Sequence, residues 1–241
     1  MIYVTSDLHG YALDKFKALL AKANFSDEDY CFVLGDVIDR GAEGVRLLRW
    51  MMLQPNVALI RGNHEQMMLD SAFAFEEITD ESIERVDRNR IATLFTWQHN
   101  GGEVTMRALR ALDAETRGEI FDFVRDAPYC DTVSAGGRDF LLTHSGLSAF
   151  RADKPLREYY AEDFLWNRPS PSDRYYDDVI TVFGHTPTIC FPDARKGRAY
   201  VTDTWIDVDT GAAFGLAPML LRLDDLAEFY ADDGDPSEGV L

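Results

Sequence analysis

The feature that most constrains the fold is a series of short apolar runs, each followed at once by a loop rich in Asp, His, Asn and Gly. In the first 65 residues three such runs alternate with segments whose apolar residues recur at helical spacing. The predicted strands are residues 2–5, 30–34 and 57–60, and the predicted helices between them are residues 13–23 and 45–53. Strands joined through helices run parallel. Because ligands bind outside the carboxyl ends of such strands, these polar loops predict a functional site.

The rest of the chain divides into a helical middle and a strand-rich end. Residues 80–126 are predicted as a helical insertion or cap, with main helices at 81–97 and 115–124 and a break at the Gly101-Gly102 pair. Strands return at 129–134, 140–143, 179–183, 199–202 and 219–223, and several are joined by turns typical of antiparallel pairs. We therefore predict one α/β or α+β domain over residues 1–230, with a mixed sheet or two sheets packed face to face.

The segment from Asp224 onward is rich in acidic residues. It is expected to form a helical turn, followed over residues 231–241 by a poorly ordered acidic tail.

Composition narrows the partners and the compartment. The chain is 46% hydrophobic and 27% charged, as in globular proteins, but its net charge is −18, and two divalent cations would neutralise only part of that. Such a surface repels nucleic acids and anionic membranes, so neither is expected as a partner. The three cysteines have no CxxC spacing, which favours reduced thiols over a zinc site or disulfides. Without a signal-peptide pattern or an apolar span of membrane length, a cytoplasmic location is expected.

Histidines mark the functional loops. Four of the five histidines stand just after apolar runs, whereas a single histidine is more often a structural residue than a ligand. The five loop segments are SDLHG (6–10), GDVIDRG (35–41), RGNHE (61–65), THSG (143–146) and GHTP (184–187). Imidazole and carboxylate together suit Mn²⁺, Fe or Zn²⁺. The pattern therefore predicts a metal site.

The spacing within these loops points to two metal ions and a phosphate. Asp7 and His9 are two residues apart, so one turn can direct both to one cation. The carboxylate of Asp36 has two oxygens and can bridge two metals about 3.5–4 Å apart. Arg40 and Arg61 stand in the same loops, and guanidinium groups match the geometry of phosphate oxygens. Hydrolysis of phosphate esters is the predicted chemistry.

The order DxHG, GDxxDRG, GNHE, H and GHTP, from Asp7 to about Gly211, resembles the phosphoprotein-phosphatase branch of the calcineurin-like metallophosphoesterases. The resemblance implies a β-sandwich flanked by helices, with two divalent ions, Mn²⁺ in the first place and Fe or Zn²⁺ as alternatives. It places the first metal on Asp7, His9 and the bridging Asp36. It places the second metal on four residues: Asp36, Asn63, His144 and His185.

The same resemblance implies the catalytic roles. His64 would be the general acid that protonates the leaving oxygen, and Asp39 would orient its ring. Arg40, Asn63 and Arg168 would contact the substrate phosphate. A metal-bridging hydroxide would attack phosphorus in line, without a phosphoenzyme intermediate.

Other polar residues have simpler interpretations beside a functional one. Arg61 would either contact phosphate or pair with an acidic neighbour. Glu65 is expected to support the ligands or to act as a helix N-terminal charge rather than to bind metal. His99 is predicted to be structural or exposed. Asp207 and Asp209 are predicted to shape a turn rather than to bind a metal.

Three functions follow, in decreasing order of support. The first is a bacterial-type serine/threonine protein phosphatase, with dual specificity left open; its substrate would be a phosphoprotein or a small phosphoester. The Asn100-Gly101-Gly102 and Leu165-Trp166-Asn167-Arg168 segments resemble those of small bacterial and phage protein phosphatases. The second is a dinucleoside polyphosphate hydrolase of the same superfamily, acting for example on diadenosine tetraphosphate. The third, a non-catalytic binding protein, is disfavoured because every ligand is present.

Overall fold

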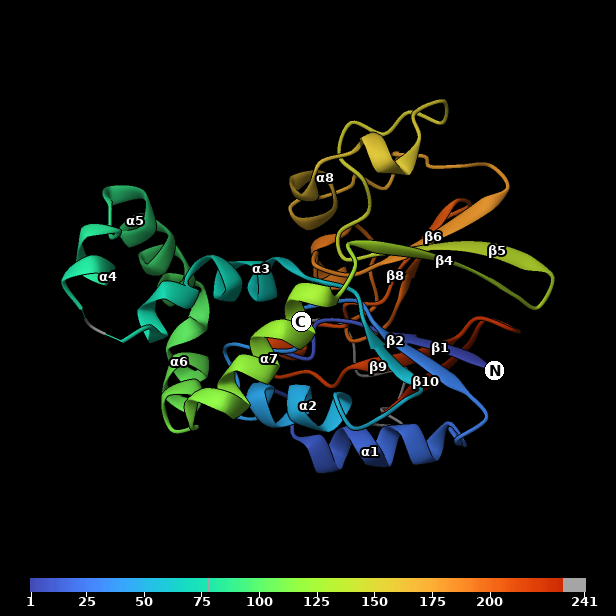
Figure 1. Cartoon of the computed structure of the whole chain (residues 1–241). Coiled ribbons are helices and arrows are strands. Elements are labelled where there is room, and N and C mark those ends of the chain that lie inside the picture. Colours follow the sequence, from blue (N-terminus) through green and yellow to red (C-terminus); the bar gives the residue numbers. More distant parts are fainter. Residues whose placement is uncertain (78, 232–241) are drawn as a thin grey trace.

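The computed structural model describes residues 1–77 and 79–231, and its strands form two five-stranded mixed sheets (Figure 1). The order of the first sheet is β10-β9-β1-β2-β3, and that of the second is β4-β5-β6-β8-β7. The strands of the first sheet are β1 (Ile2–Thr5), β2 (Tyr30–Val33), β3 (Val57–Leu59), β9 (Met219–Arg222) and β10 (Ala227–Tyr230). Those of the second are β4 (Cys130–Ala135), β5 (Arg138–Thr143), β6 (Val179–Phe183), β7 (Tyr200–Val201) and β8 (Trp205–Asp207). The predicted sandwich is confirmed.

Three neighbouring strands run parallel in each sheet. β1, β2 and β3 run parallel in the first sheet, and β5, β6 and β8 run parallel in the second. The other strands pair antiparallel: β10, β4 and β7 are edge strands, and β9 lies between β10 and β1. As a result, the loops after β1, β2, β3, β5 and β6 gather at one side of the sandwich. These are the five polar loops that the sequence identifies.

Apolar side chains fill the space between the sheets and cover the outer face of each. Val4 and Leu221 of the first sheet pack with Leu142, Val182 and Ile206 of the second in one buried cluster. A second cluster joins the first sheet to helices α1 (Leu13–Lys22) and α2 (Gly44–Met51), and to the helices that follow β3. A third covers the outer face of the second sheet, where α8 (Ala161–Leu165) lies.

The middle of the chain is helical, as predicted, but it starts earlier and is more divided. Its helices are α3 (Asn63–Asp70), α4 (Asp80–Glu84), α5 (Arg88–Trp97), α6 (Glu103–Arg110) and α7 (Ala114–Asp126). The predicted helix over 81–97 is two helices, because the Asp87 side chain caps a new helix start by accepting the Arg90 N–H at 2.9 Å. Gly101, with φ of +97°, breaks the helical path between α5 and α6. In Figure 1, α4 and α5 project to one side of the sandwich.

Two strands in the last third differ from the prediction. No strand is predicted at β8, because its three residues are too few for a periodic pattern to be visible. The helical turn predicted after Asp224 is wrong, since β10 pairs there with β9 through a tight turn in which Leu226 has φ of +60°. Residues 232–241, most of the predicted acidic tail, lie outside the described residues. Among the helices of residues 1–77 and 79–231, none combines the length and the apolar character that a membrane span needs.

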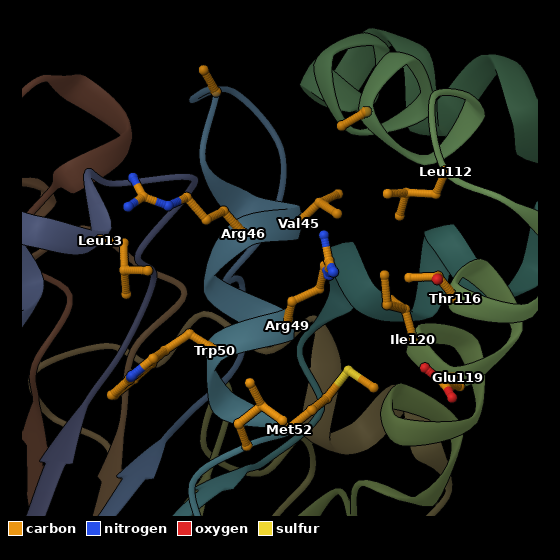
Figure 2. A pocket seen from close by; sticks show the side chains of 13 residues that line it. Leu13, Val45, Arg46, Arg49, Trp50, Met52, Leu112, Thr116, Glu119 and Ile120 are labelled. Carbon is orange, nitrogen blue, oxygen red and sulfur yellow. The ribbon is translucent and has the colours of Figure 1, made fainter.

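A pocket separates α2 from α6 and α7 (Figure 2). Val45, Arg49 and Trp50 line it on the α2 side, and Leu112 and Ile120 face them. None of the predicted metal ligands lines this pocket; they lie in the five loops instead.

The turn between β4 and β5 offers a test of the sheet contacts. Gly136 and Gly137 both have positive φ, +57° and +77°, but only at Gly136 would a Cβ overlap the carbonyl oxygen of Asp224. We expect Gly137→Ala to lower the free energy of unfolding by about 1 kcal/mol through backbone strain alone. Gly136→Ala should cost about 1–3 kcal/mol more, because the β9–β10 turn must move. Urea unfolding measures both; equal losses would contradict the contact.

Candidate metal centre

The carboxylate of Asp36 lies at the middle of the five loops. Its Oδ2 lies 3.6 Å from His9 Nε2, while its Oδ1 lies 3.5 Å from His144 Nε2. Two groups of buried side chains have ligand atoms close enough to hold a metal ion, and Asp36 belongs to both. They are His9, Asp36 and His64, and Asp36, His144 and His185. One carboxylate therefore presents one oxygen to each group.

Asp7, from the loop after β1, lies beside the first group. Asp7 Oδ1 lies 3.8 Å from His9 Nε2, and its Oδ2 accepts the backbone N–H of His185 at 2.8 Å. The His9 ring is fixed by its other nitrogen, Nδ1, which lies 3.1 Å from the Ile38 carbonyl oxygen. This leaves Nε2 directed at the carboxylates, as a metal ligand requires.

The second group draws three donors together. His144 Nε2 lies 2.8 Å from Asn63 Oδ1 and 3.1 Å from His185 Nδ1. His144 Nδ1 lies 2.7 Å from the Leu34 carbonyl oxygen, which fixes the ring as Ile38 does for His9. The converging atoms are imidazole nitrogens and an amide oxygen, which suit a divalent cation.

The backbone of these loops is strained where the site residues lie. Six of the predicted site residues have a left-handed φ between 42° and 70°: Asp7, His9, Asp36, Asp39, Arg40 and His185. Non-glycine residues in this region cost free energy and are concentrated at functional sites. Close loop contacts hold the strain in place, since a Cβ at Gly62 would overlap the Asp36 backbone nitrogen and carboxylate.

Burial sets the charge state of the ligands. It lowers the pKa of His9 to about 3 and that of His185 to about 2, so both rings are neutral near pH 7 and keep a free lone pair. Burial, with the neighbouring Asp7 and Glu65, raises the pKa of Asp36 well above its usual value. Bound cations would relieve this repulsion and desolvation, and the donor set fits them.

The residues predicted to act on substrate lie at the first group, and one of them, His64, belongs to it. His64 Nδ1 lies 2.6 Å from Asp39 Oδ2, and His64 Nε2 lies 3.8 Å from Asp36 Oδ2. The Arg40 guanidinium reaches within 3.3 Å of the same Nε2. Burial lowers the pKa of His64 to about 3 and raises that of Asp39 to about 7. At 2.6 Å an ionised Asp39 can accept the Nδ1–H of His64 and stabilise positive charge on the ring when Nε2 also carries a proton.

Arg168 lies on the side of the second group. Its Nη1 donates to Thr186 Oγ1 at 3.4 Å, one residue after His185. The structure thus brings together every predicted metal ligand, the His64–Asp39 pair and both arginines.

Arg61 has neither of the two predicted roles. It is 8% exposed and donates to Tyr129 Oη at 2.8 Å and to the carbonyl oxygens of Ala127 and Arg125. Arg61 therefore ties the loop after β3 to the end of α7. The sequence gives no sign of this, because two of the acceptors are main-chain oxygens and Tyr129 lies 68 residues away.

Glu65 supports the loops, as expected, and does not join either ligand group. Its carboxylate accepts the backbone N–H groups of Asp36 at 2.7 Å, Val37 at 2.9 Å and Gly62 at 3.1 Å. This buried acid fixes the main chain on both sides of the central carboxylate.

His99 and the two aspartates lie where their simpler interpretations predict. His99 is exposed, with Nδ1 2.9 Å from the Phe95 carbonyl oxygen. Asp207 accepts the Asp209 N–H at 2.8 Å and Asp209 accepts the Gly211 N–H at 2.9 Å, which forms a turn. Both carboxyls are nonetheless fully buried, and this burial raises their pKa values well above the usual range.

The geometry agrees with a comparison against protein families. The model of the calcineurin-like phosphoesterases matches residues 1–205, most of the chain and all five loops. The chain belongs to the calcineurin-like phosphoesterase family. This places it in the metallophosphoesterase superfamily.

The relatives of this phosphoesterase carry two kinds of name. A symmetrical bis(5'-nucleosyl)-tetraphosphatase from Azotobacter vinelandii is 30% identical, and the alignment covers 99% of this chain and 98% of that protein. Serine/threonine-protein phosphatase 1 from Salmonella typhimurium is 26% identical over 92% of this chain and 91% of that protein. The chain spans only 60% of the length of a tetraphosphatase from Pasteurella multocida, with 26% identity over 73% of this chain.

Solved structures agree on the fold. A crystal structure named provisionally as a diadenosine tetraphosphatase superposes with a TM-score of 0.60 at 14% identity, covering 94% of this phosphoesterase and 90% of that chain. At this identity the likeness shows the shared fold alone.

The number of metal ions bound per chain tests whether Asp36 is a ligand in both groups. Protein stripped with a chelator and refilled with Mn²⁺ should bind two ions per chain, measured by elemental analysis. We expect His9→Ala to lose one ion, because only one group contains His9. Asp36→Ala should lose both, since each group depends on one of its oxygens. An Asp36→Ala protein that keeps one tightly bound ion would contradict a bridging carboxylate.

Proposed function

We propose that this phosphoesterase is a metal-dependent phosphomonoesterase that acts on phosphoserine and phosphothreonine in proteins. The observation that carries the proposal is the His64–Asp39 pair. His64 Nδ1 is held 2.6 Å from the buried Asp39 carboxylate, and its Nε2 faces Asp36 and Arg40. A histidine oriented in this way beside a phosphate site can give a proton to the oxygen that leaves phosphorus.

The surrounding residues have complementary roles. Two divalent ions, Mn²⁺ in the first place, would supply an activated water and would neutralise charge that develops on the phosphoryl oxygens. Arg40, Arg168 and Asn63 would bind those oxygens and hold phosphorus between the ligand groups. His64 would then protonate the leaving oxygen from Nε2, with Asp39 accepting the Nδ1–H and stabilising the doubly protonated ring until that proton is given up.

The leaving group favours a phosphomonoester of an alcohol over a dinucleoside polyphosphate as the substrate. A serine or threonine oxygen is a poor leaving group unless it is protonated, so a held general acid accelerates its departure. A nucleotide that leaves from a polyphosphate is already a stable anion and needs that proton much less. The buried His64–Asp39 pair is therefore more useful against a phosphoester of an alcohol.

Hydrolysis of dinucleoside polyphosphates is the second candidate, and two observations favour it. The Azotobacter vinelandii relative named as a tetraphosphatase aligns over nearly the whole of both chains. In addition, Trp166 is 46% exposed, and its ring stands perpendicular to that of His185 with centroids 6.0 Å apart. An exposed indole beside a metal ligand offers a face on which a nucleobase can stack.

Side-by-side kinetics distinguish the candidates. With Mn²⁺, we expect a phosphoserine peptide to be hydrolysed with higher kcat/KM than diadenosine tetraphosphate. His64→Asn should reduce turnover of the peptide by about 10²–10⁴-fold, because the proton donor is lost. His99→Asn, which changes an exposed histidine, serves as the matched control and should keep full activity. A strong preference for the dinucleotide, or an undiminished His64→Asn enzyme, would overturn the proposal.

A further inference from the structure

The helical middle of the chain reaches back to the predicted catalytic pair. Asp39 Oδ2 accepts the indole N–H of Trp97 at 2.8 Å, and Asp39 Oδ1 accepts the hydroxyl of Thr105 at 2.5 Å. The same hydroxyl accepts the backbone N–H of Asp39 at 3.0 Å. Trp97 ends α5 and Thr105 lies in α6, so both sides of the carboxylate are held by one helical segment.

Arg40 is held by the turn between these two helices. Its backbone N–H donates to the Gly101 carbonyl oxygen at 3.1 Å. Gly101 has φ of +97°, and a Cβ there would lie 2.8 Å from Arg40 Cγ. Only glycine allows this close approach, so the break after α5 is what lets the segment contact both residues.

Burial makes these contacts matter. Asp39, Trp97 and Thr105 are 0%, 0% and 2% exposed, so no water replaces a lost hydrogen bond easily. Thr105 donates to Asp39 Oδ1, while Asp39 Oδ2 bonds to both His64 and Trp97. Because each oxygen has its own partners, the Asp39 carboxylate is held in one orientation. Buried carboxylates that lose donors take up a proton or rotate, and either change would release the His64 ring.

We infer that Trp97 and Thr105 are positioning residues for the general acid, acting through Asp39 on the orientation of His64. The inference rests on the proposed function, in which His64 protonates the leaving oxygen. Among the described residues, the side-chain hydrogen bonds of Trp97 and Thr105 go to Asp39, so the segment acts on the site through the orientation of the His64 ring. The helical middle of the chain is then part of the catalytic apparatus as well as a cover.

Substrates with different leaving groups test this role. p-Nitrophenolate leaves readily without a proton, whereas phenolate depends more on the general acid. We expect Thr105→Val and Trp97→Phe to lower kcat on phenyl phosphate by about 10- to 100-fold, with a much smaller loss on p-nitrophenyl phosphate and little change in KM. Asp39→Asn should show the same selectivity with a larger loss.

Matched controls separate positioning from general destabilisation. Thr181 in β6 is also fully buried, but its hydroxyl has no partner among the described residues, so Thr181→Val removes no hydrogen bond. Trp205 is fully buried, and its indole N–H donates to the Asp173 carbonyl oxygen, so Trp205→Phe removes a comparable bond elsewhere. Both controls should keep the ratio of the two substrate rates seen in the unchanged enzyme.

A second readout does not depend on activity. In the Zn²⁺-loaded protein, the Nδ1 proton of His64 should give a far-downfield NMR resonance, which Thr105→Val broadens or removes and Thr181→Val preserves. An unchanged resonance in Thr105→Val, or equal rate losses on both substrates, would overturn the inference. Absence of activity on any phosphoester in the unchanged protein would refute the proposed function instead, and the NMR comparison would still decide whether Thr105 holds the pair.

Discussion

The position of the Asp36 carboxylate is the constraint on which the rest of the site depends. Its two oxygens face different ligand groups at 3.5–3.6 Å, and Oδ1 also accepts the His64 backbone N–H at 3.0 Å. Glu65 fixes the main chain around it, and the absence of a side chain at Gly62 leaves it room. A small rotation of this carboxylate would separate the two groups.

The arrangement of strands in the sandwich brings the site residues together. The parallel strands of both sheets deliver their carboxyl ends to the same side, so five loops from distant parts of the sequence meet. The cost is a cluster of left-handed residues and buried acids that oppose folding. Cations would offset much of that cost, which links metal binding to the stability of the loops.

Much of the site could be predicted because its residues follow recognisable strands. β1 and β6 have the predicted bounds, and the ligands follow them at fixed short distances. The roles of Trp97 and Thr105 cannot be predicted from the sequence, because their contacts with Asp39 span 58 and 66 residues. A buried tryptophan in a helix also resembles an ordinary core residue. β10 differs from the predicted helical turn because its pairing with β9, and not its own four-residue sequence, makes it a strand.

The most direct test of the central claim is anomalous diffraction at the manganese edge from crystals of the Mn²⁺-loaded protein. The account predicts two peaks about 3.5–4 Å apart, one beside Asp36 Oδ2 and His9 and the other beside Asp36 Oδ1 and His144. A single peak, or two peaks that do not share Asp36, would contradict it.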